Sequence, residues 1–205
     1  MDLEEMKAMW QQQDKLLQEN KMLNEKLVKH LLQNKSGNAV SRMLNAEYFG
    51  AALCGVLTLF LLLRPGLITV SILLAISYIL SLAFIAGSLV LSFYKIKMLR
   101  AIDFTRNNVA TTAEQVNKFR LFINKERVVG LLLMPVLLVA FMAVITYYVD
   151  GQDMYEHFTY GIWRLAIACP LAIAGALILY RTLYFNNIKE INANLAEVKH
   201  FKNEH

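Results

Sequence analysis

The sequence is poor in the features that mark a soluble enzyme or a secreted domain. It has only two cysteines in 205 residues. Cys54 and Cys169 both lie inside apolar segments, so a disulfide framework is not expected. No Gly-rich phosphate loop, nucleophile elbow or pair of catalytic carboxylates is present, and the four histidines have no metal-ligand spacing. The sequence therefore predicts no catalytic, cofactor or metal site, and the chain is not expected to be an enzyme.

One acidic loop, "DGQDMYEHF" at residues 150–158, has side chains that can bind a metal. They are Asp150, Asp153, Glu156 and His157. Their spacing fits no known metal-binding loop, so a solvated polar turn is the preferred interpretation.

Long apolar runs, by contrast, are abundant. Hydrophobic residues make up 57% of the chain and are concentrated in residues 46–93 and 128–184. Both blocks are too long and too apolar for core helices of a soluble protein. The turn at residues 64–66 and the loop at 150–161 divide them into four spans. These are residues 46–63, 67–93, 128–149 and 162–184. The sequence predicts an all-α fold: a four-helix transmembrane bundle made of two hairpins, with helical arms.

Basic residues predict the orientation. Residues 1–45 carry seven Lys and Arg, residues 94–127 carry eight, and the loop at 150–161 carries none. Loops rich in Lys and Arg face the cytoplasm. The predicted organisation is a cytoplasmic amphipathic helix at 1–36, hairpins at 46–93 and 128–184, a cytoplasmic helical segment at 94–127 and a cytoplasmic C-terminal helix at 185–205.

The two halves of the chain resemble each other. "YKIKMLRAID" after the second span matches "YRTLYFNNIK" after the fourth, which aligns Ile102 with Ile188. Further on, "ATTAEQVNKF" matches "NANLAEVKHF", which aligns Val116 with Val198. Two spans in each unit indicate a parallel internal repeat.

The N-terminal arm has the pattern of an amphipathic helix, with apolar residues three, four or seven positions apart. Three amides, Gln13, Asn20 and Asn24, break this stripe, and a polar residue in a helical seam tends to specify one partner or register. The residues predicted to bind a partner are Leu3, Met6, Trp10, Gln13, Leu17, Asn20, Leu23 and Leu27.

Two local signals predict where the arms begin and end. Lys35-Ser36-Gly37-Asn38 is expected to end the first helix before span one, because Gly and Asn are common C-terminal stop residues. Thr111-Thr112-Ala113-Glu114 is expected to cap the start of a helix in the central segment.

The interior of the spans lacks Asp, Glu, Lys and His. Coupled transporters and proton relays place ionisable groups there, so this absence argues against transport. Pro135 and Pro170 are interpreted as kinks that shape packing. The basic central segment carries no nucleic-acid reading motif, so direct binding of nucleic acid is not expected.

Three stretches carry a resemblance to a known family: "MDLEEMKAMWQQQDKLLQENKMLNEKLVKHLLQNKS", "YKIKMLRAIDF" and "VNKFRLFINKERVVGLLL". The chain resembles small four-span proteins of the bacterial inner membrane that are commonly encoded beside extracytoplasmic-function sigma factors. The resemblance implies the same membrane and a regulatory role, such as that of an anti-sigma factor. Zinc-binding anti-sigma factors have a motif in which a His is followed by Cys-x-x-Cys. This motif is absent from the sequence.

The leading hypothesis is a membrane-anchored regulatory interaction protein that holds a cytosolic partner, with a sigma factor as the first candidate. Helix-in-groove docking of the arm would supply the contact. Two alternatives stay open: a structural membrane protein that self-assembles through a coiled coil of its arms, and a small transporter or channel.

Overall fold

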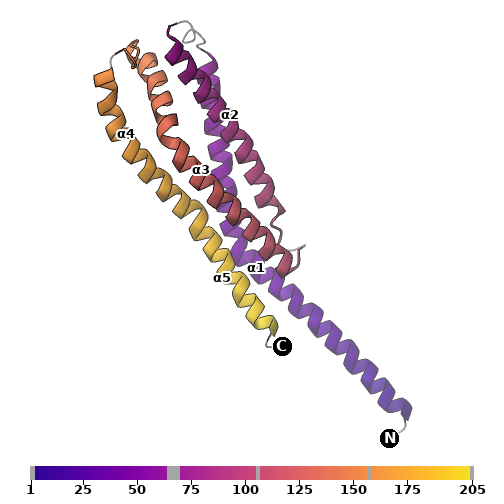
Figure 1. Ribbon diagram of the computed structural model, residues 1–205. Helices are drawn as coiled ribbons and strands as arrows, with labels where there is room; N and C mark the ends of the chain where they lie inside the picture. The colour runs from indigo at the N-terminus through magenta and orange to yellow at the C-terminus, as the bar shows by residue number, and fades with distance from the viewer. Residues whose placement is uncertain (1–2, 64–69, 105–106, 157, 204–205) are drawn as a thin grey trace.

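The computed structural model describes residues 3–63, 70–104, 107–156 and 158–203, and every regular element in these ranges is helical (Figure 1). The elements are α1 (Leu3–Leu62), α2 (Ile72–Ala101), α3 (Val109–Asp150), α4 (Phe158–Leu179), the π-helical turn η2 (Tyr180–Phe185) and α5 (Asn186–Asn203). The prediction of an all-helical chain is confirmed for these residues.

Four helical stretches are long and apolar enough to cross a membrane: Met9–Leu62, Ile72–Ala101, Val109–Asp150 and Gly161–Lys199. This agrees with the four apolar helices that the sequence predicts. The helices are longer than the predicted spans, however, because the polar arms continue the same helices. α1 joins the N-terminal arm to the first apolar segment without a break, and η2 joins α4 to α5.

α1 does not end at residues 35–38, so the predicted helix stop is wrong. Ser36 is fully buried and accepts a hydrogen bond from the side chain of Asn194 in α5 at 3.1 Å. Ala39 and Met43, further along α1, are also fully buried. A glycine costs a helix about 1 kcal/mol relative to alanine, and burial of this helix face outweighs the cost of Gly37.

α3 begins earlier than predicted. Its N-cap is Asn108, and the Thr112 hydroxyl donates to the Asn108 carbonyl at 3.1 Å, so Thr112 lies inside the first turn. Pro135 and Pro170 lie inside α3 and α4, and both helices continue through them.

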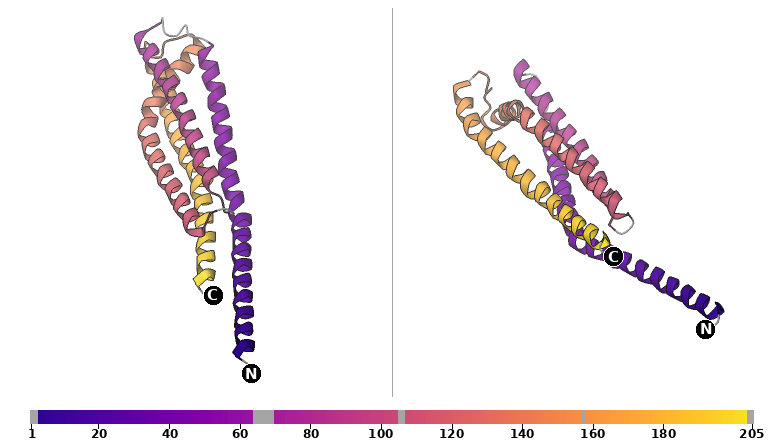
Figure 2. Two further views of the ribbon diagram at one scale, coloured as in Figure 1. Left: turned by 90° about the vertical axis from the view of Figure 1, so that its right-hand side faces the viewer. Right: turned by 60° about the horizontal axis from the view of Figure 1, so that its bottom comes forward.

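The helices lie side by side in an elongated arrangement whose two ends differ (Figures 1 and 2). At one end, which we call the loop end, α1 leads to α2 and α3 leads to α4. At the opposite end, which we call the arm end, α2 leads to α3. The N-terminal arm and α5 extend past this last turn. Along the arrangement α1 contacts α2, α2 contacts α3 and α3 contacts α4, while α5 contacts α1 and α3.

Two hydrophobic clusters hold the helices together. The arm-end cluster draws residues from α1, α2, α3, η2 and α5, among them Met43, Leu99, Phe119, Ile123 and Ile191. The loop-end cluster contains Leu61, Leu74, Tyr78, Ile85, Ala143, Val144 and Met154.

The two pairs aligned by the internal similarity, Ile102 with Ile188 and Val116 with Val198, all lie in the arm-end cluster. The two halves differ in their backbone, because α2 ends at Ala101 whereas α4 continues through η2 into α5. The internal repeat itself stays a prediction.

The loop between α3 and α4 packs against the start of α2. Asp153 is 6% exposed, and its carboxylate accepts hydrogen bonds from the Ser71 hydroxyl at 2.6 Å and the Tyr155 N–H at 2.9 Å. Ser71 is the N-cap of α2, so this carboxylate ties the second half of the chain to the first. The predicted solvated turn is therefore wrong for Asp153. Next to it Met154 is buried, and a Cβ on Gly161 would lie 2.5 Å from its Cγ, so a larger residue there would displace the Met154 side chain.

The Asp153 contact yields a test. Asp153→Ala is expected to lower the free energy of unfolding by about 1–3 kcal/mol, because two partly buried donors lose their acceptor. Glu156→Ala, at an exposed position in the same loop, should change it by less than about 0.5 kcal/mol. Unfolding in detergent micelles measures both variants, and equal effects would contradict the docking role of Asp153.

The continuity of α1 yields a second test. Gly37→Ala is expected to stabilise the protein by about 0.5–1 kcal/mol, because alanine is the better helix former and no described atom lies within 4 Å of the added Cβ. The same unfolding measurement applies. A loss of stability would indicate that α1 breaks at this glycine.

Candidate functional site

The N-terminal arm, residues 3–31 of α1, extends away from the other helices (Figure 2, left). Every side chain that the structure describes among residues 4–27 is exposed. Large apolar side chains are among them: Trp10 is 70% exposed, Leu17 65% and Leu23 58%. A contiguous set of exposed apolar side chains is typical of an interaction surface.

All the predicted partner-binding residues lie on this arm. Those whose side chains are described are exposed: Met6, Trp10, Gln13, Leu17, Asn20, Leu23 and Leu27. Leu3 is the first residue of α1, and its side chain lies outside the described part. Helical spacing brings these residues to one side of the arm, and the described remainder of the chain leaves that side open.

Further along α1 the apolar stripe is covered. Val28 is half-buried, and Leu32 is 2% exposed. Both pack in the arm-end cluster, to which Ile191 and Leu195 of α5 also belong. The polar segments of the chain therefore pack on one another from about residue 28 onward and leave residues 4–27 free for another molecule.

A buried ion cluster lies beside the arm-end cluster and joins four helical elements. It consists of Glu47 of α1, Lys95 of α2, Glu126 of α3 and Tyr184 of η2. The Lys95 ammonium lies 2.8 Å from Glu47 Oε1 and 3.0 Å from Glu126 Oε1. Tyr184 donates a hydrogen bond to Glu47 and accepts one from Lys95 at 3.4 Å. The side chains of Glu47 and Lys95 are 3% and 8% exposed.

The ion cluster depends on its single ammonium group. Lys95 separates two carboxylates that would otherwise repel each other in a dry environment. Glu126 Oε2 is buried and makes no hydrogen bond to the described residues, so Glu126 relies on Lys95 for compensation. Lys95 therefore fixes α1, α2 and α3 relative to one another at this level.

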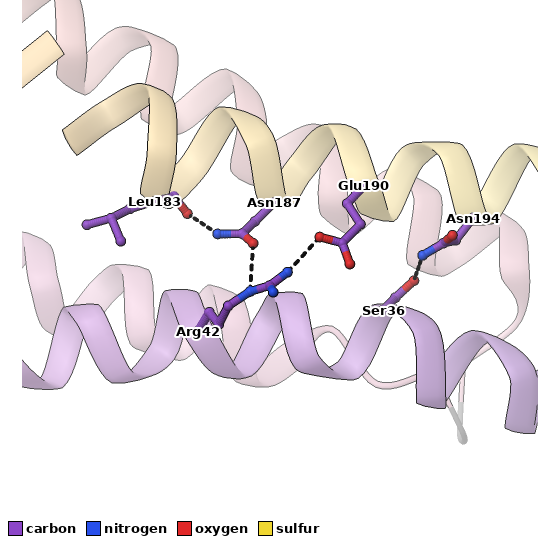
Figure 3. Close-up of polar contacts among 6 residues, drawn as sticks. All are labelled: Ser36, Arg42, Leu183, Asn187, Glu190 and Asn194. Carbon is purple, nitrogen blue, oxygen red and sulfur yellow. Dashed lines mark hydrogen bonds and ion pairs between the residues drawn. The ribbon is translucent and has the colours of Figure 1, made fainter. Parts of the chain in front are cut away.

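A second polar contact set joins α1 to α5 (Figure 3). Arg42 forms an ion pair with Glu190 at 2.6 Å and donates to the Asn187 side chain at 3.0 Å. Six residues earlier in α1, Ser36 accepts the hydrogen bond from Asn194. These contacts fix the direction in which α1 leaves the helical assembly, and hence the direction of the arm.

The turn η2 interrupts the regular α-helical pattern next to this interface. The Asn187 side chain donates to the Leu183 carbonyl at 2.7 Å (Figure 3). Such π-helical turns are frequent at functional sites. An open hollow of about 560 Å³ lies here, lined by Arg42, Asn45, Thr182, Leu183, Asn186, Asn187 and Glu190. The guanidinium group of Arg42 is already paired with Glu190 and Asn187. The hollow is therefore part of the polar interface between α1 and α5.

The ion cluster was not predicted from the sequence. Lys95 belongs to the basic residues that indicate the orientation, and Glu47 and Glu126 lie at the edges of spans one and three, where a single sequence assigns them no partner. One signal was available: an acidic residue at each of two span entrances where basic residues dominate. An acid at such a position indicates a partner on another helix.

Comparison of the chain with protein-family models, with curated proteins and with solved structures found no match. Among the described residues, no group of three or more His, Cys, Asp and Glu side chains is arranged to hold a metal ion. The arm and the ion cluster are therefore the features from which a function is inferred.

The ion cluster yields a prediction for stability. Lys95→Met is expected to lower the free energy of unfolding by about 3–5 kcal/mol, because the buried Glu47 and the partly buried Glu126 lose their counter-ion. Lys97→Met, at an exposed position on the same helix, should change it by less than about 0.5 kcal/mol. Unfolding of the protein in detergent micelles measures the difference.

A combined variant serves as a rescue control. With Glu47→Gln and Glu126→Gln added to Lys95→Met, no buried charge remains, and most of the stability should return. If Lys95→Met were as stable as Lys97→Met, the ion cluster would not hold the helices together.

Proposed function

We propose that this chain is a multi-pass protein of the bacterial inner membrane whose N-terminal arm holds a cytosolic regulatory protein at the membrane. The four apolar helices would form a transmembrane bundle of two hairpins. The supporting observations are four helices long and apolar enough to cross a membrane and an arm whose apolar side chains are exposed.

The distribution of charge supports a cytoplasmic location for the arm end. The loop at residues 150–161 carries acidic residues and no Lys or Arg, whereas the arm end carries most of the basic residues. By the positive-inside rule the arm end faces the cytoplasm. Both termini, α5 and the turn between α2 and α3 then lie in the same compartment as the partner.

The single observation that carries the proposal is the open apolar side of the arm. Burial of one large apolar side chain contributes about 1.5–3 kcal/mol. Four such side chains, of which Trp10 and Leu17 are the most exposed on the arm, contribute about 6–12 kcal/mol before the cost of association is subtracted. With the lowest association cost, about 4 kcal/mol, the upper part of this range leaves about 8 kcal/mol, which corresponds to a micromolar complex.

The mode of binding would be helix in groove. The arm has no tight turn and no proline, and it is continuous with the first apolar segment, so it enters a groove as a preformed helix and loses little conformational entropy. Trp10 and Leu17 would act as apolar anchors. Gln13 lies between them and Asn20 follows Leu17 on the same side, and both would fix the register through hydrogen bonds.

A sigma factor is the first candidate partner, because the chain resembles membrane proteins that are commonly encoded beside extracytoplasmic-function sigma factors. Retention at the membrane would keep such a factor away from RNA polymerase. Release would follow from any change that weakens the arm's contact.

A pair of double variants tests the role of the arm. Trp10→Ala with Leu17→Ala is expected to reduce co-purification of the sigma factor encoded nearest to this chain at least tenfold, since buried Trp anchors are worth about 2–4 kcal/mol at interfaces. Gln11→Ala with Gln18→Ala changes the opposite side of the same helix turns and should leave capture unchanged.

The outcomes separate the alternatives. Capture that survives removal of residues 2–31 would rule out the arm as the binding site. If the first pair instead lowers the mass of a detergent-solubilised oligomer and no sigma factor is captured by the wild type, the arm serves self-assembly and the proposal is wrong.

A further inference from the structure

The arm has opposite charges at its two ends. Residues 2–14 contain four acidic side chains and one Lys, a net side-chain charge of −3. Residues 15–31 contain four Lys and two Glu, a net charge of +2. The two halves are about 20 Å and 25 Å long at 1.5 Å per residue, and both lengths exceed the Debye length of about 8 Å at physiological salt. A partner therefore meets two separate fields, negative at the N-terminal end and positive toward the rest of the protein.

The apolar side of the arm is wider than the seam of a two-stranded coiled coil. Its residues form three rows at seven-residue spacing: Met9, Leu16 and Leu23; Leu3, Trp10, Leu17, Asn24 and Leu31; and Met6, Gln13, Asn20 and Leu27. Three amides thus lie among the apolar residues of the second and third rows. At about 100° per residue these rows span roughly 160° of the helix. A two-stranded coiled coil uses two rows, whereas a helix that packs against two neighbours uses three. The width fits a groove between two helices.

A second copy of this chain is a poor occupant of that surface. Because α1 is continuous, the arms of copies in one membrane would point the same way and meet in parallel. Parallel arms would place acidic half beside acidic half and basic half beside basic half, which is repulsive.

We propose that the arm docks in a groove between two helices of a cytosolic protein whose charge runs in the opposite direction. This groove is basic where it meets residues 2–14 and acidic where it meets residues 15–31. The inference rests on the proposed function, since it describes the partner of the same arm. Its consequence is orientation: only one direction of the groove along the arm satisfies both fields, so the partner is held in a fixed pose relative to the membrane.

The charges nearest the apolar side contribute most to this selection. Asp14 and Lys21 are exposed and lie about 100° and 80° from the centre of the apolar side, one heptad apart. Lys15 is also exposed but lies about 160° from that centre, on the back of the helix. Lys21 and Lys15 thus form a matched pair for a charge-reversal test.

Designed helical hairpins are suitable probes. One hairpin has an apolar groove with lysines at one end and glutamates at the other, and a second has the same composition with the charges mixed at both ends. The full-length protein in nanodiscs is expected to bind the polarised hairpin at least tenfold more tightly at about 0.01 M salt. The difference should largely disappear at about 1 M salt, where the Debye length is about 3 Å.

Two charge-reversal variants of the arm and a photo-crosslink test the direction in which the groove lies along the arm. Lys21→Glu should reduce binding of the polarised hairpin about fivefold or more, and Lys15→Glu less than twofold. A photo-crosslinker at the basic end of the hairpin should label the arm near Met9 and not near Leu27. Equal affinity for the two hairpins, binding of neither, or arms that associate with each other instead would each overturn the inference.

These outcomes are independent of the sigma-factor experiment. If the hairpins show the expected preference and no sigma factor is captured by the wild type, the proposed partner is wrong and the description of the surface stands. If a sigma factor is captured through the arm and the hairpins bind equally, the polarity inference alone fails.

Discussion

The contact of one buried lysine with two glutamates determines how the helices of this protein are arranged. Lys95 lies within 3.0 Å of carboxylates from α1 and α3 and within hydrogen-bond distance of a tyrosine from η2. Apolar side chains between helices in lipid provide little directional information, because lipid tails are as apolar as the residues. A buried charge has few acceptable positions, so the ion cluster specifies the register of four elements that apolar packing alone would leave free to slide.

The position of the arm follows from this register. With α1 fixed at Glu47, the next three turns toward the N-terminus pack on α5 through Arg42 and Ser36. Beyond Val28, which still packs against the arm-end cluster, every described side chain of α1 is exposed. The arm is thus the free end of a helix whose other half is held by α5, and its direction is set by the contacts of Ser36 and Arg42, outside the arm.

This arrangement separates two tasks along a single helix. The half of α1 from Leu32 onward contributes to the folded core, and its polar residues pair with α5 through Ser36 and Arg42 and with α2 through Glu47. The half before residue 28 contributes no described buried side chain and keeps apolar residues exposed. A helix that served only to stabilise this chain would not need these apolar residues, which is the physical basis for assigning them to another molecule.

Much of the fold was accessible from the sequence, because it depends on local patterns. Continuous apolar runs gave the four long helices, and the spacing of Met6, Trp10 and Leu17 gave the amphipathic arm and the side that is open. The helix stop at Gly37 was wrong because helix propensity is worth about 1 kcal/mol, and burial of Ser36, Ala39 and Met43 against other helices exceeds it. Asp153 was likewise assigned to solvent because its partner, Ser71, lies 82 residues away in the chain.

By itself, the sequence determined which segments are helical and apolar, which side of the arm is apolar and how the arm's charge is distributed, since each of these properties repeats with the period of one helix. Only the tertiary structure decided that Glu47, Lys95, Glu126 and Tyr184 share one site, and that the stripe is covered from Leu32 and open before residue 28. Both depend on which helices lie beside each other. Few arrangements of the helices give every buried charge a partner, and this requirement determines which helices are neighbours. Such pairing leaves no periodic signal in a single sequence.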